Sequence, residues 1–307
     1  MSLEHPIIAV TGSSGAGTST VRSAFEHIFN RLHLKAVYVE GDSFHRYDRE
    51  EMKNVVQRAL VRGETFSHYS PAANHLDRLE ALFREYSQHG TGEIRRYLHT
   101  EDEALPYGQH AGSFTPWTPI PEGTDVLFYE GLHGGVVTDR VDVAQYVDLL
   151  VGVAPAINLE WIQKIHRDTG ERGYSREDVT KMILLRMSDY INYITPQFSR
   201  TDINFQRIPL VDTSNPFIAR DVPTPDESLV IIRFRRPRRL KVEFPFLLSM
   251  LHGSFMTRPN TLCIPGGKMP MAMEIILRPL IEDIARKRRK MRRAAKGKDN
   301  SKDNGAS

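Results

Sequence analysis

Short apolar runs alternate with segments whose apolar residues recur at helical spacing. Residues 6–11 predict a buried strand that ends at a glycine, and residues 21–32, with apolar side chains three or four positions apart, predict an amphipathic helix. Further strands are expected at 36–40, 126–129 and 148–153, and further helices at 49–61, 75–86, 159–168 and 176–193. This alternation predicts the α/β class, a mostly parallel sheet flanked by helices.

Two regions depart from that alternation. Residues 98–122 are rich in Pro, Gly, His and Thr, which indicates a long loop that is either functional or mobile. After Gln197, strand-like pieces at 208–211, 229–233 and 243–248 precede a final helix from Met271, and we expect them to form an edge of the same sheet. Since neither an internal repeat nor a Gly/Ser linker interrupts the first 290 residues, we predict a single domain over residues 1–285.

Composition narrows the class of protein. Apolar residues make up 40% of the 307 positions and charged residues 26%, which is typical of a soluble globular protein. No apolar run approaches the roughly 18 residues of a membrane span, and the N-terminus lacks the pattern of a signal peptide, so a cytoplasmic protein without a membrane partner is expected. The single cysteine, Cys263, excludes an internal disulfide, a thiolate zinc site and a dithiol switch.

The charge is unevenly distributed. Residues 286–307 hold ten Lys and Arg against two Asp, a net charge of +8, so the overall +3 leaves −5 for residues 1–285. We interpret this basic tail as the frayed, solvated and disordered end of the last helix. The alternative is that the tail contacts a nucleic acid or an acidic partner.

The chemistry begins with a glycine-rich segment between the first strand and the first helix. Residues 12–19 match the phosphate-binding pattern G-x-x-x-x-G-K-[ST] except that Thr18 replaces the lysine. The glycines let backbone N–H groups face phosphate oxygens at a helix N-terminus, and Ser19 is placed to bind Mg²⁺. An ordinary strand-to-helix turn is the alternative. The expected phosphate-binding residues are Gly12, Ser13, Ser14, Gly15, Ala16, Gly17, Thr18, Ser19 and Thr20.

A missing lysine requires another cation, because charge builds on the β- and γ-phosphates during transfer. On the helix predicted from about residue 158, Lys164, Arg167 and Asp168 share one face, and Arg172 follows. A solvated charged face is the plain alternative. The pattern makes Lys164 and Arg167 candidates for replacing the lysine.

Two carboxylates follow predicted strands, where ligands bind in open parallel sheets. Asp42 follows the second strand and Glu130 the third. A helix cap and a loop ion pair are the alternatives for the two. Transfer of a phosphoryl group to an alcohol needs the hydroxyl proton accepted and the metal held. We therefore expect Asp42 to be the base and Glu130 to serve Mg²⁺, with Asp168 as a second metal candidate.

Beyond Asp42, three cationic or titratable residues recur every four positions. His45, Arg49 and Lys53 would line one face if a helix ran through all of them, which favours an anionic acceptor. Tyr97 and His99, expected at the end of an edge strand, are further candidate contacts; otherwise they are ordinary surface residues.

The sequence closely resembles the phosphoribulokinase family, specifically its proteobacterial branch among the P-loop small-molecule kinases. The resemblance runs from Ile7 to about Ile284. Five segments carry it: GSSGAGTST (12–20), EGDSFHR (40–46), FYEGLHG (128–134), NLEWIQKIHRD (158–168) and QFSRTDINFQR (197–207). It implies a P-loop fold and ATP-dependent, Mg²⁺-requiring phosphorylation of D-ribulose 5-phosphate to D-ribulose 1,5-bisphosphate, a Calvin-cycle step of carbon dioxide fixation.

The resemblance also assigns residues. It implies that Asp42 is the catalytic base, that Glu130 and Asp168 serve the metal, and that Lys164 and Arg167 contact phosphate. It matches His45, Arg49, Lys53, Tyr97, His99 and Arg172 to sugar-phosphate contacts. Thr18 is what the bacterial branch carries.

Regulation is implied only by the resemblance. Bacterial members are typically octamers activated by NADH and inhibited by AMP, and Arg31, Arg220, Arg233 and Arg258 match their effector arginines. For Arg233, a cation on an edge strand is the alternative. The tail after Ala285 is longer and more basic than the family leads us to expect. The rival functions are another P-loop kinase, of the uridine or pantothenate type, and a non-catalytic protein that binds ATP or nucleic acid.

Overall fold

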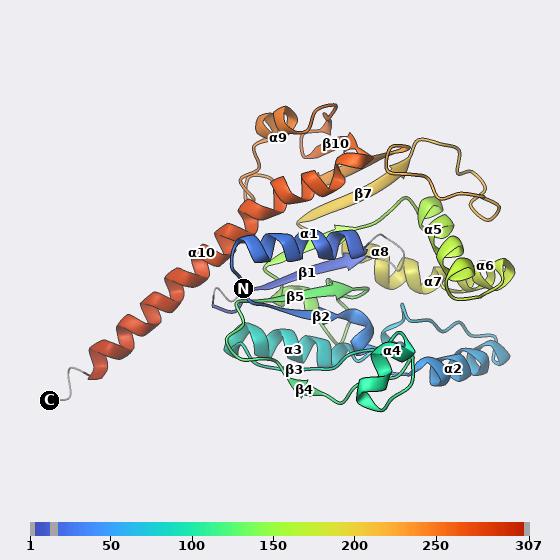
Figure 1. The fold of residues 1–307 in the computed structure, drawn as a ribbon, viewed down its shortest axis with the longest axis horizontal. Coiled ribbons are helices and arrows are strands. Elements are labelled where there is room, and N and C mark those ends of the chain that lie inside the picture. Colours follow the sequence, from blue (N-terminus) through green and yellow to red (C-terminus); the bar gives the residue numbers. More distant parts are fainter. Residues whose placement is uncertain (1–3, 13–17, 304–307) are drawn as a thin grey trace.

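The computed structural model describes the backbone of residues 4–12 and 18–303 and the side chains of 4–12 and 21–291 (Figure 1). Its centre is an eight-stranded sheet. The strand order is β2 (Ala36–Glu40), β5 (Val126–Gly131), β1 (Ile7–Gly12), β6 (Leu149–Val153), β7 (Ile203–Pro209), β8 (Ser228–Phe234), β10 (Thr261–Pro265) and β9 (Phe255–Arg258). The first five strands are parallel and the last three are antiparallel to their neighbours.

Helices cover both faces of this sheet. On one face, α1 (Thr18–Arg31) and α10 (Met269–Asp303) pack against the strands, with Phe25 and Phe29 of α1 contacting Phe128 at ring-centroid distances of 4.8 and 5.7 Å. On the other face, α3 (Leu76–His89) contributes Leu79 and Phe83 to a second core. The parallel α/β sheet with C-terminal strands and a final helix, predicted from sequence, is confirmed.

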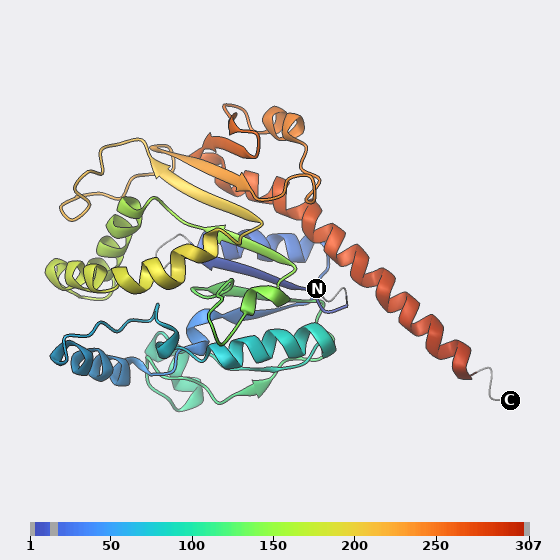
Figure 2. The ribbon, with the colours of Figure 1, turned by 180° about the vertical axis from the view of Figure 1, so that it is seen from behind.

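The remaining helices gather mostly beyond one end of the parallel strands (Figures 1 and 2). They are α2 (Arg49–Val61), α4 (Glu101–Ala104), α5 (Ile157–Gly170), α6 (Arg176–Leu185), α7 (Met187–Asp189) and α8 (Thr195–Phe198), whereas α9 (Phe244–Met250) lies near β10. A small hairpin pairs β3 (Glu93–Ile94) with β4 (Thr118–Pro119). Among the described helices, none is both long and apolar enough to span a bilayer.

Four predicted elements are wrong in detail. The strand expected at 208–211 is β7 at Ile203–Pro209, which shares only residues 208 and 209 with it. Residues 243–248 form most of α9, because Pro245 suits the first turn of a helix and withholds a donor from a sheet. The helix predicted over 176–193 divides into α6, α7 and a π-helical turn at Tyr190–Ile194 before α8, near Pro196. Tyr97 ends no edge strand, since it forms only an isolated bridge to Phe114.

The last helix corrects the expected boundary at residue 285. Residues 286–303 continue α10, and Arg288 is only 5% exposed. Its guanidinium donates to the carbonyl oxygens of Glu4 at 3.1 Å and Thr124 at 3.0 Å and forms an ion pair with Asp125. The first turn of the basic segment is therefore ordered, because the buried Arg288 bonds it to the rest of the domain. Beyond that turn α10 runs away from the sheet (Figures 1 and 2).

Candidate active site

The carboxyl ends of the parallel strands meet at one edge. Glu130 on β5 lies level with Val10 on β1 and with Glu40 on β2, and Gly12 lies level with Val153 on β6. The phosphate-binding candidates Ser13, Ser14, Gly15, Ala16 and Gly17, which follow β1 at this edge, lie outside the described residues. Thr18, Ser19 and Thr20 begin α1, and their side chains also lie outside the described part. The expected phosphate site therefore joins the edge that carries Glu130.

The ends of β2 and β5 approach each other unusually closely. A Cβ atom on Gly131 would lie 2.6 Å from Cα of Gly41, and one on Gly41 would lie 2.7 Å from the hydroxyl oxygen of Tyr129. Only glycine fits at both positions, since a Cβ atom at either one would meet the backbone of the other and the fully buried side chain of Tyr129. This contact fixes the turn that presents Asp42 relative to Glu130.

Asp42 lies in the 3₁₀ turn Gly41–Phe44 that follows β2. Its Oδ1 is 3.2 Å from Nε2 of His45, and the side chain is 43% exposed, so a substrate can reach it. The dense surroundings of the carboxyl favour its neutral form, but the charges of His45, His99 and His68 outweigh this effect and hold the pKa of Asp42 well below its usual range. Asp42 is therefore ionised at neutral pH.

The expected acceptor-binding residues gather around Asp42. The ring of Tyr97 is 6.2 Å from that of His45 and 4.8 Å from that of His99. The guanidinium of Arg49 donates to the carbonyl oxygen of His99 at 3.0 Å. Burial raises the pKa of Tyr97, against the opposing effects of the charge of Arg49 and its hydrogen bond to Tyr97.

The expectation that His45, Arg49 and Lys53 share one helical face is wrong. An N-terminal capping box between Asp48 and Glu51 starts α2 at Arg49, so His45 precedes the helix. Lys53 is exposed and pairs with Glu50 at 2.7 Å. The structure thus brings His45 and Arg49 to Asp42 by two different elements and leaves Lys53 further out in solvent.

A second group of cations lies on and after α5. Asp168, 2% exposed, accepts from Lys164 through Oδ2, and from Arg167 at 3.1 Å and Arg172 at 3.3 Å through Oδ1. Burial favours the neutral acid, but these three cations hold the pKa of Asp168 below its usual value. The pairing orients the cations, since a buried carboxylate fixes side chains that would otherwise move freely in water.

Burial and the charge of Arg186 lower the pKa of Lys164 to about 8, against the opposing effect of Asp168. If its cation is needed for phosphate binding, kcat/KM for ATP falls as pH rises through about 8, because Lys164 is then neutral. Saturating ATP moves the loss in kcat to higher pH, since bound phosphates stabilise the cation. Initial rates over a pH series measure both. In Lys164→Arg, whose guanidinium stays charged, this alkaline loss should disappear; its persistence would contradict the assignment.

Glu130 and Asp168 are the two expected carboxylates for Mg²⁺. Both carboxylate oxygens of Asp168 contact cations, and Glu130 is half-buried at the carboxyl end of β5. No cluster of three or more His, Cys, Asp or Glu that could hold a metal occurs among the described residues. This is compatible with Mg²⁺, which commonly uses one or two protein carboxylates together with water and substrate phosphates.

Three of the four expected effector arginines, Arg31, Arg233 and Arg258, lie away from this edge. Arg220 instead follows Ala219, whose carbonyl oxygen is 3.1 Å from Nε2 of His166 on α5. Arg233 on β8 and Arg258 on β9 both align with Thr261 on the intervening β10, while Arg31 at the end of α1 pairs with Glu274 at 3.2 Å. Arg220 is exposed in the segment between β7 and β8. Arg233 donates to the carbonyl oxygen of Phe198 at 2.6 Å and lies on an interior strand, so the alternative of an edge-strand cation is wrong.

Sequence reasoning missed several residues that shape the site. Arg95 donates to the carbonyl oxygens of Ser43 at 2.7 Å and His45 at 2.6 Å, and so fixes the turn that carries Asp42. Buried Gln197 contacts Thr11 near the end of β1, accepting from its hydroxyl at 2.9 Å. Gln197 is the first residue of the segment 197–207 that carries the family resemblance, but its position in the sequence did not indicate a role in the site. These contacts join segments far apart in the chain, which a local pattern does not reveal.

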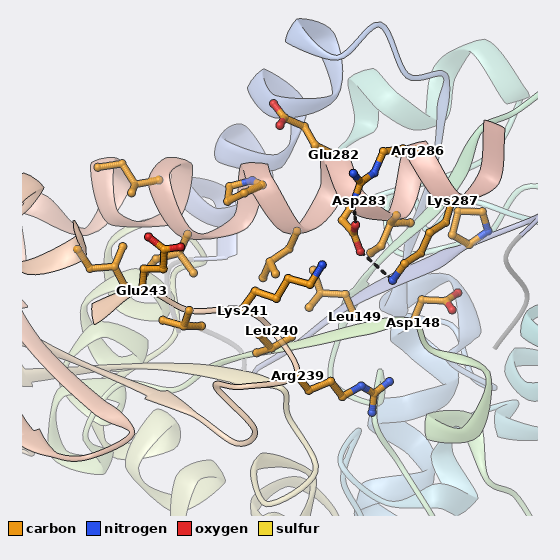
Figure 3. Close-up of a pocket in the computed structure, with 18 of the residues that line it drawn as sticks. Asp148, Leu149, Arg239, Leu240, Lys241, Glu243, Glu282, Asp283, Arg286 and Lys287 are labelled. Carbon is orange, nitrogen blue, oxygen red and sulfur yellow. Dashed lines mark hydrogen bonds and ion pairs between the residues drawn. The ribbon is translucent and has the colours of Figure 1, made fainter. Parts of the chain in front are cut away.

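A pocket among the described residues lies elsewhere. It has a volume of about 650 Å³ and lies between α10, the segment after β8 and the start of β6, where Asp148 and Leu149 are found (Figure 3). Lys287 and Arg286 at its margin pair with Asp283. Because Asp148 precedes β6, this pocket lies toward the amino ends of the parallel strands and is separate from Asp42 and Asp168.

Comparison with known proteins agrees with this architecture. The sequence profile of the Phosphoribulokinase / Uridine kinase family matches residues 7–214. A plasmid-encoded phosphoribulokinase of Cupriavidus necator is 58% identical over 291 residues, which cover 94% of this chain and 99% of that protein. A probable phosphoribulokinase of Escherichia coli is 60% identical over 282 residues, covering 92% and 97% respectively.

A solved structure extends the likeness to three dimensions. The phosphoribulokinase from Rhodobacter spheroides superimposes with a TM-score of 0.87 at 52% identity, covering 94% of this chain and all of the other. The profile match, the identities and the superposition all include the elements that carry Asp42, Glu130 and Lys164. The chain belongs to the phosphoribulokinase / uridine kinase family.

Proposed function

We propose that this protein transfers the γ-phosphoryl group of ATP to the C1 hydroxyl of D-ribulose 5-phosphate, forming D-ribulose 1,5-bisphosphate and ADP. The observation that carries the proposal is identity of 52 to 60% to phosphoribulokinases over nearly the whole chain. The geometry agrees with it, since ionised Asp42 lies among cationic and hydrogen-bonding side chains suited to a sugar phosphate.

Asp42 accepts the hydroxyl proton while the sugar oxygen bonds to the γ-phosphorus and the bond from that phosphorus to the β–γ bridging oxygen breaks. An ionised carboxylate is sufficient, because phosphoryl transfer depends more on positioning and charge stabilisation than on a strong base. Lys164 and Arg167 contact the transferring phosphate, with Asp168 as their common partner. Glu130 would hold Mg²⁺, with Ser19 as the second expected ligand, and the ion would neutralise further phosphate charge.

Arg49, His45, Tyr97 and His99 bind the acceptor, and Arg172 and Lys53 extend this group. Arg172 supports the placement, because its charge acts on Tyr97 while its guanidinium contacts Asp168. Arg172 therefore links the cations around Asp168 with the side chains proposed to bind the acceptor. The 5-phosphate of the acceptor is the anion that such a group would select over a neutral nucleoside.

The proposal includes a regulated homo-oligomer in the cytoplasm, an octamer activated by NADH. Its support is the likeness to the family together with the positions of Arg31, Arg233 and Arg258 away from the Asp42 edge and of Arg220 on the segment beside α5. Arg258 and Arg220 are exposed, as a surface that receives an effector or a neighbouring subunit requires.

ADP formation, followed by a coupled assay with and without ribulose 5-phosphate, tests the function. We expect ATP turnover that depends on this sugar phosphate and not on uridine or pantothenate. Turnover with uridine alone would favour the rival kinase. Absence of turnover, together with salt-sensitive nucleic-acid binding that is lost on deleting residues 286–307, would favour the non-catalytic rival.

Replacing Arg49 by Met should raise KM for ribulose 5-phosphate by about 10-fold or more and change KM for ATP little, because a charge-assisted contact to the acceptor is lost. The Lys53→Met change should act in the same direction but less, since Lys53 is solvated and paired with Glu50. Arg62→Met, at the exposed far end of α2, is the matched control. Equal effects of Arg49→Met on both KM values would exclude the assignment.

A further inference from the structure

Asn74 and His45 are held side by side by their backbones. The two residues form an antiparallel bridge, in which Arg46 N–H donates to the carbonyl oxygen of Ala73 at 2.8 Å and His75 N–H to that of Phe44 at 2.7 Å. Both side chains are buried, and Oδ1 of Asn74 is 2.8 Å from Nδ1 of His45. The contact between the two side chains is thus fixed before any substrate binds.

The orientation of the Asn74 amide is determined by its other partners. Its Nδ2 lies 2.8 Å from the carbonyl oxygen of His68 and 2.8 Å from that of Ser70, and both of these atoms are acceptors. A flipped amide would place its oxygen against two carbonyl oxygens, so the amide group donates to them. Oδ1 therefore faces His45, and Nδ1 of His45 must carry a proton to donate to it.

The other ring nitrogen of His45 faces the candidate base. Nε2 is 3.2 Å from Oδ1 of Asp42. With the proton of a neutral imidazole already committed to Nδ1, a bare Nε2 would oppose the carboxylate with a lone pair. A proton on Nε2 removes this repulsion and makes a charge-assisted hydrogen bond.

The neighbouring His68 is disfavoured as a charged imidazole. The ring of His68 lies 4.2 Å from that of His45, and burial, followed by the charges of His45 and Arg186, lowers the pKa of His68 well below its usual value. His99 and Tyr97 face the same space, and Arg95 contacts the backbone carbonyl of His45 rather than its ring.

We propose that Asn74 is a positioning residue that keeps His45 protonated on both ring nitrogens, so that Nε2–H anchors Oδ1 of Asp42 and leaves Oδ2 for the acceptor hydroxyl. This inference rests on Asp42 being the base of the proposed reaction. Asn74 acts on the reaction only through His45. Its removal therefore changes the protonation of His45 and the orientation of the Asp42 carboxylate.

Two variants separate the acceptor of Asn74 from its donors. Asn74→Asp and Asn74→Leu both lose the bonds to the carbonyl oxygens of His68 and Ser70, but only Asn74→Leu loses the acceptor for Nδ1–H. We expect Asn74→Leu to lower kcat by about 10- to 100-fold with KM for ATP unchanged, and Asn74→Asp to retain more of kcat than Asn74→Leu does. Ser70→Ala, in the same turn, should match wild type.

Nitrogen NMR of the substrate-free enzyme labelled in histidine reads the protonation directly, with the His45 signals identified by their loss in His45→Gln. We expect both ring nitrogens of His45 to be protonated at pH 7 in wild type and in Asn74→Asp, and one to lose its proton at lower pH in Asn74→Leu. A singly protonated His45 in wild type, or equal kcat in the two Asn74 variants, would overturn the proposal. Because the spectrum needs no substrate, it is independent of whether ribulose 5-phosphate is the acceptor.

Discussion

The Asp42→Asn enzyme should bind ATP and ribulose 5-phosphate almost as wild type does and lose about 10²- to 10⁴-fold in kcat. A positioned base contributes on this order, and the amide keeps the size of the side chain while it cannot accept the hydroxyl proton. Because Asp42 is ionised at neutral pH, the loss should persist across the neutral range. Steady-state rates with each substrate varied in turn separate kcat from the two KM values.

Asp48→Asn is the matched control for this change. It is the same replacement six residues away, at the cap of α2, where asparagine caps a helix about as well as aspartate. We expect it to keep kcat near that of wild type. If Asp42→Asn behaved like Asp48→Asn, Asp42 would not be the base.

Lys164→Met should cost a few kcal/mol of transition-state stabilisation, as expected when a cation aimed at developing phosphate charge is removed. The methionine keeps the length of the buried stem, and Arg167 and Arg172 still neutralise Asp168. The measurement is kcat/KM for ATP at pH 7, where Lys164 is charged. Lys181→Met, an exposed lysine on α6, is the control and should change little.

Thr18→Lys restores the usual phosphate-loop lysine and asks whether Lys164 has replaced it. Alone, the new ammonium should bring no gain in kcat and should lower it, since it competes with resident cations for the same oxygens. In the Lys164→Met background it should recover part of the lost activity. If Lys164→Met alone were fully active, Lys164 would not replace the missing lysine. The phosphate charge would then be neutralised by Arg167, by Mg²⁺ or by another group.

The parallel half of the fold was predictable because its elements have clear local signatures. The strand predicted at residues 6–11 is a continuous apolar run, and the helix predicted over 49–61 follows a capping residue. The structure has both elements where they were expected. The C-terminal half has weaker signals. Phe244–Met250 is apolar except for Ser249, which suits a strand or a short helix, and only packing in the finished protein decides between them.

Candidate site residues were predictable where a local pattern implies chemistry. Asp42 and Glu130 are carboxylates at strand ends, and Lys164 lies on a charged face of a helix. Asn74 and Arg95 do not, because they act through backbone carbonyl oxygens of distant segments. Their roles depend on tertiary geometry, which single-sequence patterns do not encode.

The central position of β1 has a consequence for synthesis of the chain. Both neighbours of this strand, β5 and β6, come far later in the sequence, and Arg288 bonds the carbonyl of Glu4 across 284 positions. The roughly 110 residues between β1 and β5 take on the order of 10 s to translate, so the apolar first strand leaves the ribosome without either partner. Chaperones that bind nascent apolar segments have that interval in which to protect it.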